Sequence, residues 1–164
     1  MVQVRVLGVA LDAAGQRIVL LKPLLDEVGA GRVLPIWIGD QEATSIAIAI
    51  QGEQASRPLT HDLMKTLLDA VNVPVERVEV TRIEDGTFFA EITLAMPEGP
   101  LVLDARPSDA VALAVRTDAP LFVAEEVLEA SSIPAAVVES RAEEAAVDEF
   151  KKFLDDVDPE DFQG

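Results

Sequence analysis

Apolar and polar residues alternate along much of the chain, and this pattern predicts several β-strands. Residues 2–11 and 17–21 flank a short loop that contains Gly15, and we expect them to form a hairpin. Residues 33–38 are a third extended run, and Pro35 within it favours an edge or bulged strand. The same pattern, with a tight turn at Asp85-Gly86, predicts strands over 75–83, 87–96, 101–103 and 121–123.

A helical spacing of apolar residues interrupts the strands in four places. Gly39-Asp40 precedes a helix whose expected buried face is Ala43, Ile46, Ala47 and Ile50, and Glu125 begins a short helix near residue 131. Two other helices are expected to be capped by Thr60 and by Ser108, since a hydroxyl can accept a first-turn N–H. In the helix that follows Thr60, the expected apolar face is Leu63, Met64, Leu67, Leu68 and Val71. The predicted fold is therefore α+β, with a mixed, mostly antiparallel sheet of hairpins packed by several short helices.

The last thirty residues differ from the rest, so we divide the chain into a domain over 1–134 and an appendage over 135–164. An apolar stripe in the appendage predicts an amphipathic helix followed by an acidic tail. The stripe consists of Val138, Ala142, Ala146, Phe150 and Leu154.

The formal net charge of −17 makes nucleic acid an electrostatically unfavourable partner unless basic groups or a metal are concentrated at one site. Residues 1–134 hold 20 acids and 10 bases, and residues 135–164 hold 10 acids and 3 bases. The chain has no cysteine, which excludes disulfides and thiolate chemistry. Neither a secretory leader nor a membrane span is predicted, so we expect a cytoplasmic protein that does not contact membranes.

Two similar stretches place an arginine and a proline before a helix start: Arg57-Pro58-Leu59-Thr60-His61-Asp62 and Arg106-Pro107-Ser108-Asp109. Helix capping and the helix dipole are sufficient to explain the hydroxyl residues Thr60 and Ser108 and the acids that follow them. An arginine beside a helix N-terminus also offers a fork of N–H donors to an anion, and such a site suits a phosphate.

The candidate chemistry depends on carboxylates and one histidine. His61 is the only histidine, so every mechanism that needs two is excluded, and no Gly-x-Ser-x-Gly elbow or phosphate-binding loop occurs. Convergence of Glu42, Asp62, Asp104 and Asp109 would provide the hard oxygen ligands that Mg²⁺ or Mn²⁺ prefers.

Four groups of residues, in order along 1–134, together resemble the bifunctional nuclease (BFN) domain family, and in particular its bacterial single-domain members. The groups are Leu34-Pro35-Ile36-Trp37-Ile38-Gly39 with Glu42-Ala43, Arg57-Pro58-Leu59-Thr60-His61-Asp62-Leu63, Phe88-Phe89-Ala90, and Asp104-Ala105-Arg106-Pro107-Ser108-Asp109-Ala110. The resemblance implies an α+β domain, self-association into a homo-oligomer, and nuclease activity on DNA and RNA. The residues that belong to its motifs are Glu42, Arg57, Thr60, His61, Asp62, Asp104, Arg106, Ser108 and Asp109.

Two hypotheses follow. The first is a metal-assisted nuclease, whose candidate metal ligands are Asp62, Asp104, Asp109 and Glu42. In this hypothesis His61 is the base or orients water. The candidate substrate-binding residues are Arg57, Thr60, Arg106 and Ser108. The second is a non-catalytic oligomeric module that binds a small anion or a protein, with a structural ion pair between Asp104 and Arg106. A narrower hypothesis adds that the acidic tail occupies the arginine-lined site and inhibits it.

Overall fold

The computed structural model describes residues 1–27 and 29–138, which form one eight-stranded sheet and four helices with a further helical turn over 135–138. The elements are β1 (Val2–Leu11), β2 (Arg17–Pro23), β3 (Arg32–Trp37), α1 (Asp40–Gln51), α2 (Thr60–Ala70), β4 (Val75–Glu84), β5 (Thr87–Met96), β6 (Gly99–Ala105), α3 (Pro107–Thr117), β7 (Leu121–Val123), α4 (Glu125–Ser131) and β8 (Ile133–Pro134).

The strand order in the sheet is β6-β5-β4-β7-β1-β2-β3-β8. The pairs are antiparallel except β4 with β7, which run parallel because the chain returns to the sheet after α3. The predicted α+β class with a mixed, mostly antiparallel sheet is therefore confirmed. Pro35 of β3 pairs with Leu20 of β2, whereas the short β8 reaches only Arg32 and Val33 on the other side. This open side accommodates a proline that has no N–H to donate.

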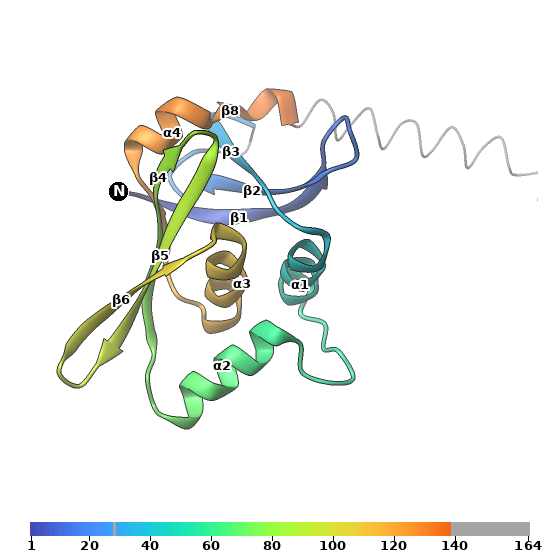
Figure 1. Ribbon diagram of the computed structural model, residues 1–164. Helices are drawn as coiled ribbons and strands as arrows, with labels where there is room; N and C mark the ends of the chain where they lie inside the picture. The colour runs from blue at the N-terminus through green and yellow to red at the C-terminus, as the bar shows by residue number, and fades with distance from the viewer. Residues whose placement is uncertain (28, 139–164) are drawn as a thin grey trace, which may run out of the picture.

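Helix α3 is central to the arrangement of the helices. All of its residues from Pro107 to Ala114 are buried except Asp109, which is partly exposed. The helix contacts β4 and β5. Helices α1 and α2 each pack against α3, and Figure 1 shows α1 and α3 side by side beneath the sheet with α2 below them. Because the three helices contact one another around α3, their first turns can form a common site.

Both predicted hydroxyl caps are wrong, Thr60 by one position and Ser108 by two. Helix α3 begins at Pro107 with Arg106 as its N-cap, since the fixed φ and the missing N–H of proline suit the first helical position. Ser108 is then a buried residue of the first turn, two positions past the N-cap. Helix α2 has Leu59 as its N-cap, and the N–H of Leu59 donates to Oδ2 of Asp62 at 2.9 Å.

The apolar residues of α2 are only partly covered. Met64 and Leu68 pack against the core, but Leu63, Leu67 and Val71 are 51%, 59% and 65% exposed. The spacing of the apolar residues predicted the helix correctly. That spacing does not show whether the apolar side of the helix packs against its own chain or against another molecule.

The appendage begins within the described residues. Ala135 is buried, and it forms a small apolar cluster with Leu20 and Val33, against which Val138 packs. The remainder of the predicted amphipathic helix and the acidic tail, residues 139–164, lie outside the described residues. The division after residue 134 stays a prediction. Within the described part of the chain, no helix is both long enough and apolar enough to span a membrane.

Candidate functional site

The first turns of α1, α2 and α3 converge on a cavity of about 380 Å³. Glu42 comes from the start of α1, Thr60 and His61 from the start of α2, and Arg106 and Asp109 from the start of α3. None of the three N-cap residues caps its helix with a side-chain hydrogen bond. The positive ends of three helix dipoles meet at the cavity and favour an anion, whereas the first-turn acids Glu42 and Asp109 on its wall oppose one.

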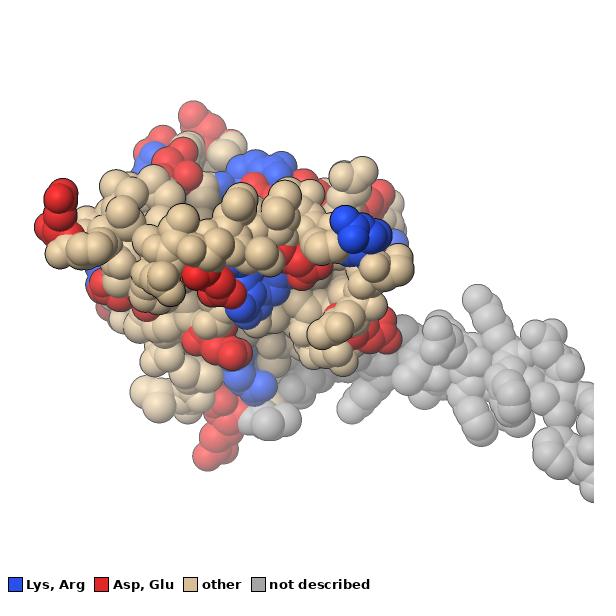
Figure 2. All heavy atoms as spheres, turned by 90° about the horizontal axis from the view of Figure 1, so that it is seen from below, with Lys and Arg blue, Asp and Glu red and all other residues tan. Residues whose placement is uncertain are grey.

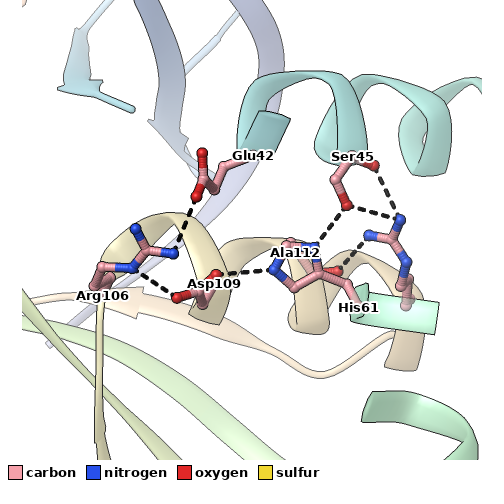
Figure 3. A network of polar contacts seen from close by, with 7 residues as sticks. Glu42, Ser45, His61, Arg106, Asp109 and Ala112 are labelled. Atoms are coloured by element: carbon pink, nitrogen blue, oxygen red, sulfur yellow. Dashed lines mark hydrogen bonds and ion pairs between the residues drawn. The ribbon is translucent and has the colours of Figure 1, made fainter. Parts of the chain in front are cut away.

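Arg106 is the exposed cation of this site. Its Nε donates to Oδ2 of Asp109 at 2.8 Å and its Nη2 donates to Oε1 of Glu42 at 3.0 Å, as Figure 3 shows. These carboxylates, Asp109 foremost, raise the pKa of Arg106, so the guanidinium stays charged. Its side chain is 65% exposed, and its Nη1 makes no hydrogen bond to the described residues. The expected pair between Asp104 and Arg106 is wrong, because Glu42 and Asp109 are the ion-pair partners of this guanidinium.

A chain of hydrogen bonds leads from Arg106 into the protein interior. Beyond Asp109, Oδ1 of its carboxylate lies 2.9 Å from Nε2 of His61, and Nδ1 of His61 lies 2.7 Å from Oγ of Ser45. Exposure falls along this chain, since the side chain of Asp109 is 27% exposed and that of His61 only 7%. Burial raises the pKa of Asp109, but the hydrogen bonds from Arg106 and His61 outweigh this effect and the net pKa is lowered. Asp109 is therefore a charged carboxylate at the wall of the cavity.

The hydrogen-bond partners define the tautomer of His61. A carboxylate only accepts hydrogen bonds, so the Nε2 that faces Asp109 carries a hydrogen. In the neutral ring Nδ1 is then an acceptor, and the hydroxyl of Ser45 donates to it. Nη2 of Arg116 donates to the same Ser45 Oγ at 3.0 Å, which leaves the hydroxyl hydrogen free to point towards the ring. Ser45, which Arg116 holds in place, thus orients the His61 ring through Nδ1, on the side away from Asp109.

Arg116 binds all three helices. Its Nε donates to Oδ1 of Asp62 in α2 at 2.7 Å, its Nη2 to the carbonyl of Ser45 in α1 at 3.1 Å, and its Nη1 to the carbonyl of Ala112 in α3 at 3.0 Å. The side chain of Arg116 is only 5% exposed. Its hydrogen bond is the main cause of the lowered pKa of Asp62. Asp62 therefore helps to hold the helices together, and it is not among the residues that line the cavity.

The sequence-predicted residues separate into two groups. Glu42, Thr60, His61, Arg106 and Asp109 line the cavity together. The others are elsewhere: Asp62 is paired with Arg116, Asp104 is exposed on β6 opposite Glu91, Arg57 is exposed in the loop before α2, and Ser108 lines an adjoining cavity.

Two residues of the network were not predicted. Ser45 lies within an apolar helical run, and Arg116 ends the α3 helix, where a basic residue is ordinarily explained by the helix dipole. A polar residue on the buried face of a predicted helix is the signal that could have identified Ser45. Arg116 carries no comparable local signal.

The described residues contain no group of three or more histidines, cysteines, aspartates or glutamates placed to hold a metal ion. Glu42 and Asp109 are the two carboxylates on the cavity wall, and Arg106 already bridges them. A divalent cation shared by these two carboxylates would have to displace the guanidinium of Arg106 from them.

Charge on the surrounding surface is mixed. Figure 2 shows, on the face seen from below, basic and acidic side chains in separate small groups among uncharged residues. That face has no continuous basic band of the kind that binds a nucleic-acid backbone nonspecifically. Among the residues that line the cavity, Arg106 is the one arginine or lysine available to a phosphate.

Comparisons with known proteins place this arrangement in a family. The model of the Bifunctional nuclease domain matches residues 23–136, which include all three helix starts. The chain is 38% identical over 168 residues to a protein of Mycobacterium tuberculosis (strain ATCC 25618 / H37Rv) named Uncharacterized protein Rv1829, and the match covers 98% of each chain. It is 31% identical to Bifunctional nuclease 2 of Arabidopsis thaliana over 100 residues, which are 59% of this chain and 30% of the plant protein. It is 25% identical to Bifunctional nuclease 1 of Oryza sativa subsp. japonica over 115 residues, which are 68% of this chain and 34% of the rice protein.

The family model spans most of the described fold, from the end of β2 to the start of the appendage, and it takes in the whole hydrogen-bond network from Glu42 to Arg116. The resemblance inferred from four short motifs thus extends over the domain that holds the site. This protein belongs to the bifunctional nuclease domain family.

Proposed function

We propose that this protein hydrolyses phosphodiester bonds of DNA, RNA or both at the cavity where α1, α2 and α3 begin. The observation that carries the proposal is an exposed guanidinium, Arg106, at the meeting point of three helix N-termini in a chain of the bifunctional nuclease domain family. A fork of N–H donors beside helix N-termini is suited to a phosphate group.

The residues have distinct roles in this proposal. Arg106 binds the non-bridging oxygens of the phosphate and neutralises the charge that develops during attack. Asp109 faces the cavity as a carboxylate, where it can accept a hydrogen bond from a water molecule and orient it towards the phosphate. His61 is a positioning residue: with its side chain only 7% exposed, it fixes the carboxylate of Asp109 through Nε2.

The proposal includes a divalent cation, Mg²⁺ or Mn²⁺, which Glu42 and Asp109 would hold once Arg106 has left them to bind the phosphate. Hard carboxylate oxygens fit such an ion. When bound, it would supply charge neutralisation and a more acidic water molecule. Asp62 and Asp104 are not proposed as ligands. Asp62 pairs with Arg116, and Asp104 lines neither cavity at the helix starts.

The test is cleavage of single-stranded DNA and RNA by highly purified protein with Mg²⁺, Mn²⁺ or EDTA. We expect Asp109→Asn to lose cleavage while its circular dichroism spectrum stays that of the wild type. Asp104→Asn is the matched control, since it makes the same chemical change five residues away on exposed β6, and we expect it to cleave normally. Equal cleavage by wild type and Asp109→Asn would refute this site. A loss in Asp104→Asn alone would assign the activity to β6.

A second candidate function is a non-catalytic oligomeric module that binds a small anion or a protein partner. The exposed apolar residues Leu63, Leu67 and Val71 of α2 favour an interface on this surface, since contiguous exposed apolar side chains mark interaction sites. We propose that this surface joins two copies of the chain, with or without nuclease activity. The cytoplasmic location stays a prediction from the sequence.

A further inference from the structure

A second and larger cavity, of about 690 Å³, adjoins the site. The turn between β1 and β2, the end of β3, the turn between β4 and β5, and the starts of α1 and α3 contribute to its wall. Arg106 lines this cavity as well as the smaller one, so the two meet at its guanidinium. A molecule whose phosphate lies on Arg106 would therefore have the larger cavity beside it.

The larger cavity has an aromatic wall. Trp37, the only tryptophan of the chain, is 54% exposed although large apolar side chains are usually covered, and Phe88 also lines the cavity. The indole is held in place, because its Nε1–H donates to Oδ2 of Asp12 at 2.8 Å. The other oxygen of Asp12 accepts the N–H groups of Ala14 and Gln16 at 2.9 and 2.8 Å. Trp37 is thus an ordered, exposed aromatic surface whose one polar group is already satisfied.

Charge also distinguishes this cavity. Its lining residues include two arginines, Arg17 and Arg106, and one acid, Asp40. Asp40 pairs with Arg17 at 3.3 Å, so the net positive charge of the lining comes from Arg106. The smaller cavity has two acids, Glu42 and Asp109, and one arginine. An anionic ligand with an aromatic part is therefore better matched to the larger cavity.

We infer that the larger cavity is a nucleobase subsite, in which Trp37 and Phe88 stack against a base of a single strand whose adjacent phosphate lies on Arg106. This inference rests on the proposed function and specifies its substrate as single-stranded nucleic acid. Every base has a π-face that stacks on an aromatic ring, so the subsite accepts different bases. In a duplex the faces of the bases are covered by their neighbours, which makes paired strands poor ligands.

The test is binding of a ten-nucleotide oligo(dT) in EDTA, measured by the fluorescence of Trp37 and by the anisotropy of a labelled oligonucleotide. We expect the oligonucleotide to change the tryptophan emission of the wild type. Trp37→Ala should weaken binding about tenfold, the typical loss for one stacked base, whereas Trp37→Phe keeps an aromatic ring and should retain most of the affinity. A ten-base-pair duplex should bind more weakly than the single strand.

Phe88 and Phe89 form a matched pair, because they are neighbours on β5 and their side chains project to opposite faces of the sheet. Phe88 lines the cavity, whereas Phe89 lies under the guanidinium of Arg82, 4.0 Å from the ring centre. We expect Phe88→Leu to weaken binding and Phe89→Leu to leave it unchanged. Equal affinity of wild type and Trp37→Ala, with an unchanged tryptophan emission, overturns the subsite.

Cleavage by wild type and by Asp109→Asn is measured in parallel, so that the two proposals can fail separately. If the wild type cleaves, Asp109→Asn does not, and Trp37→Ala binds as the wild type does, the nuclease proposal stands and the nucleobase subsite is wrong. If the wild type neither cleaves nor binds the single strand, both are wrong.

Discussion

Arg116 joins α1, α2 and α3, and its replacement by methionine tests whether this guanidinium stabilises the helix assembly. Methionine retains much of the length of the side chain but has no N–H donors. The change removes four hydrogen bonds, to Asp62, to Ala112 and twice to Ser45, and it leaves the carboxylate of Asp62 without its cation. Breaking a buried pair from one side typically costs about 3–5 kcal/mol.

The structure places the expected cost at the lower end of that range. Asp62 is 39% exposed and keeps its hydrogen bond from the N–H of Leu59, so water can partly replace Arg116. We expect Arg116→Met to lower the free energy of unfolding by about 3 kcal/mol. For a chain of this size the melting temperature should fall by about 6–12 °C. Urea and thermal unfolding followed by circular dichroism at pH 7 measure both quantities.

The control is Arg5→Met, which removes an exposed arginine whose side chain makes no hydrogen bond or ion pair to the described residues. It should change stability by less than about 0.5 kcal/mol. A loss in Arg116→Met as small as in this control would refute the assigned role. In the double variant with Asp62→Asn, the combined loss should be smaller than the sum of the single losses, since both changes remove one interaction.

The same pair has a characteristic dependence on pH. Arg116 lowers the pKa of Asp62 in the folded protein, so the unfolded state binds a proton more readily. The stabilisation is then complete above the ordinary aspartate pKa of about 3.9 and is lost as the pH falls through the lower folded value. The stability difference between wild type and Arg116→Met should therefore shrink as the pH falls below about 4. A constant difference over this range would contradict the ion pair.

Two further predictions concern the network and the surface of α2. Because His61 is the only histidine, ¹⁵N-histidine NMR reports on one ring, and we expect the Nε2–H tautomer in the wild type and a shifted Nδ1 resonance in Ser45→Ala; an unchanged Nδ1 resonance would mean that Ser45 does not donate to the ring. Leu67→Glu should reduce the mass measured by light scattering if α2 joins two copies, whereas Leu25→Glu, at a 98% exposed position in the loop after β2, should not; a monomeric wild type would refute this interface.

Local pattern was sufficient for most of the fold. Alternation and helical spacing located seven of the eight strands and all four described helices, because each depends on residues a few positions apart. The missing strand, β8, has only two residues and exists because it pairs with Arg32 and Val33. Helix α2 begins one residue and α3 two residues earlier than predicted, and in α3 the fit of Pro107 to the first helical position outweighs the capping preference of Ser108.

The sequence by itself determined the fold class, the family and five of the residues that line the site: Glu42, Thr60, His61, Arg106 and Asp109. Only the tertiary structure decided their partners. Arg106 pairs with Glu42, which is 64 residues away, and not with the nearby Asp104. The roles of Ser45 and Arg116 could not be predicted from the sequence, because their hydrogen bond depends on the packing of α1 against α3. Periodicity is a local property of the chain, whereas a hydrogen bond between two helices depends on how those helices pack.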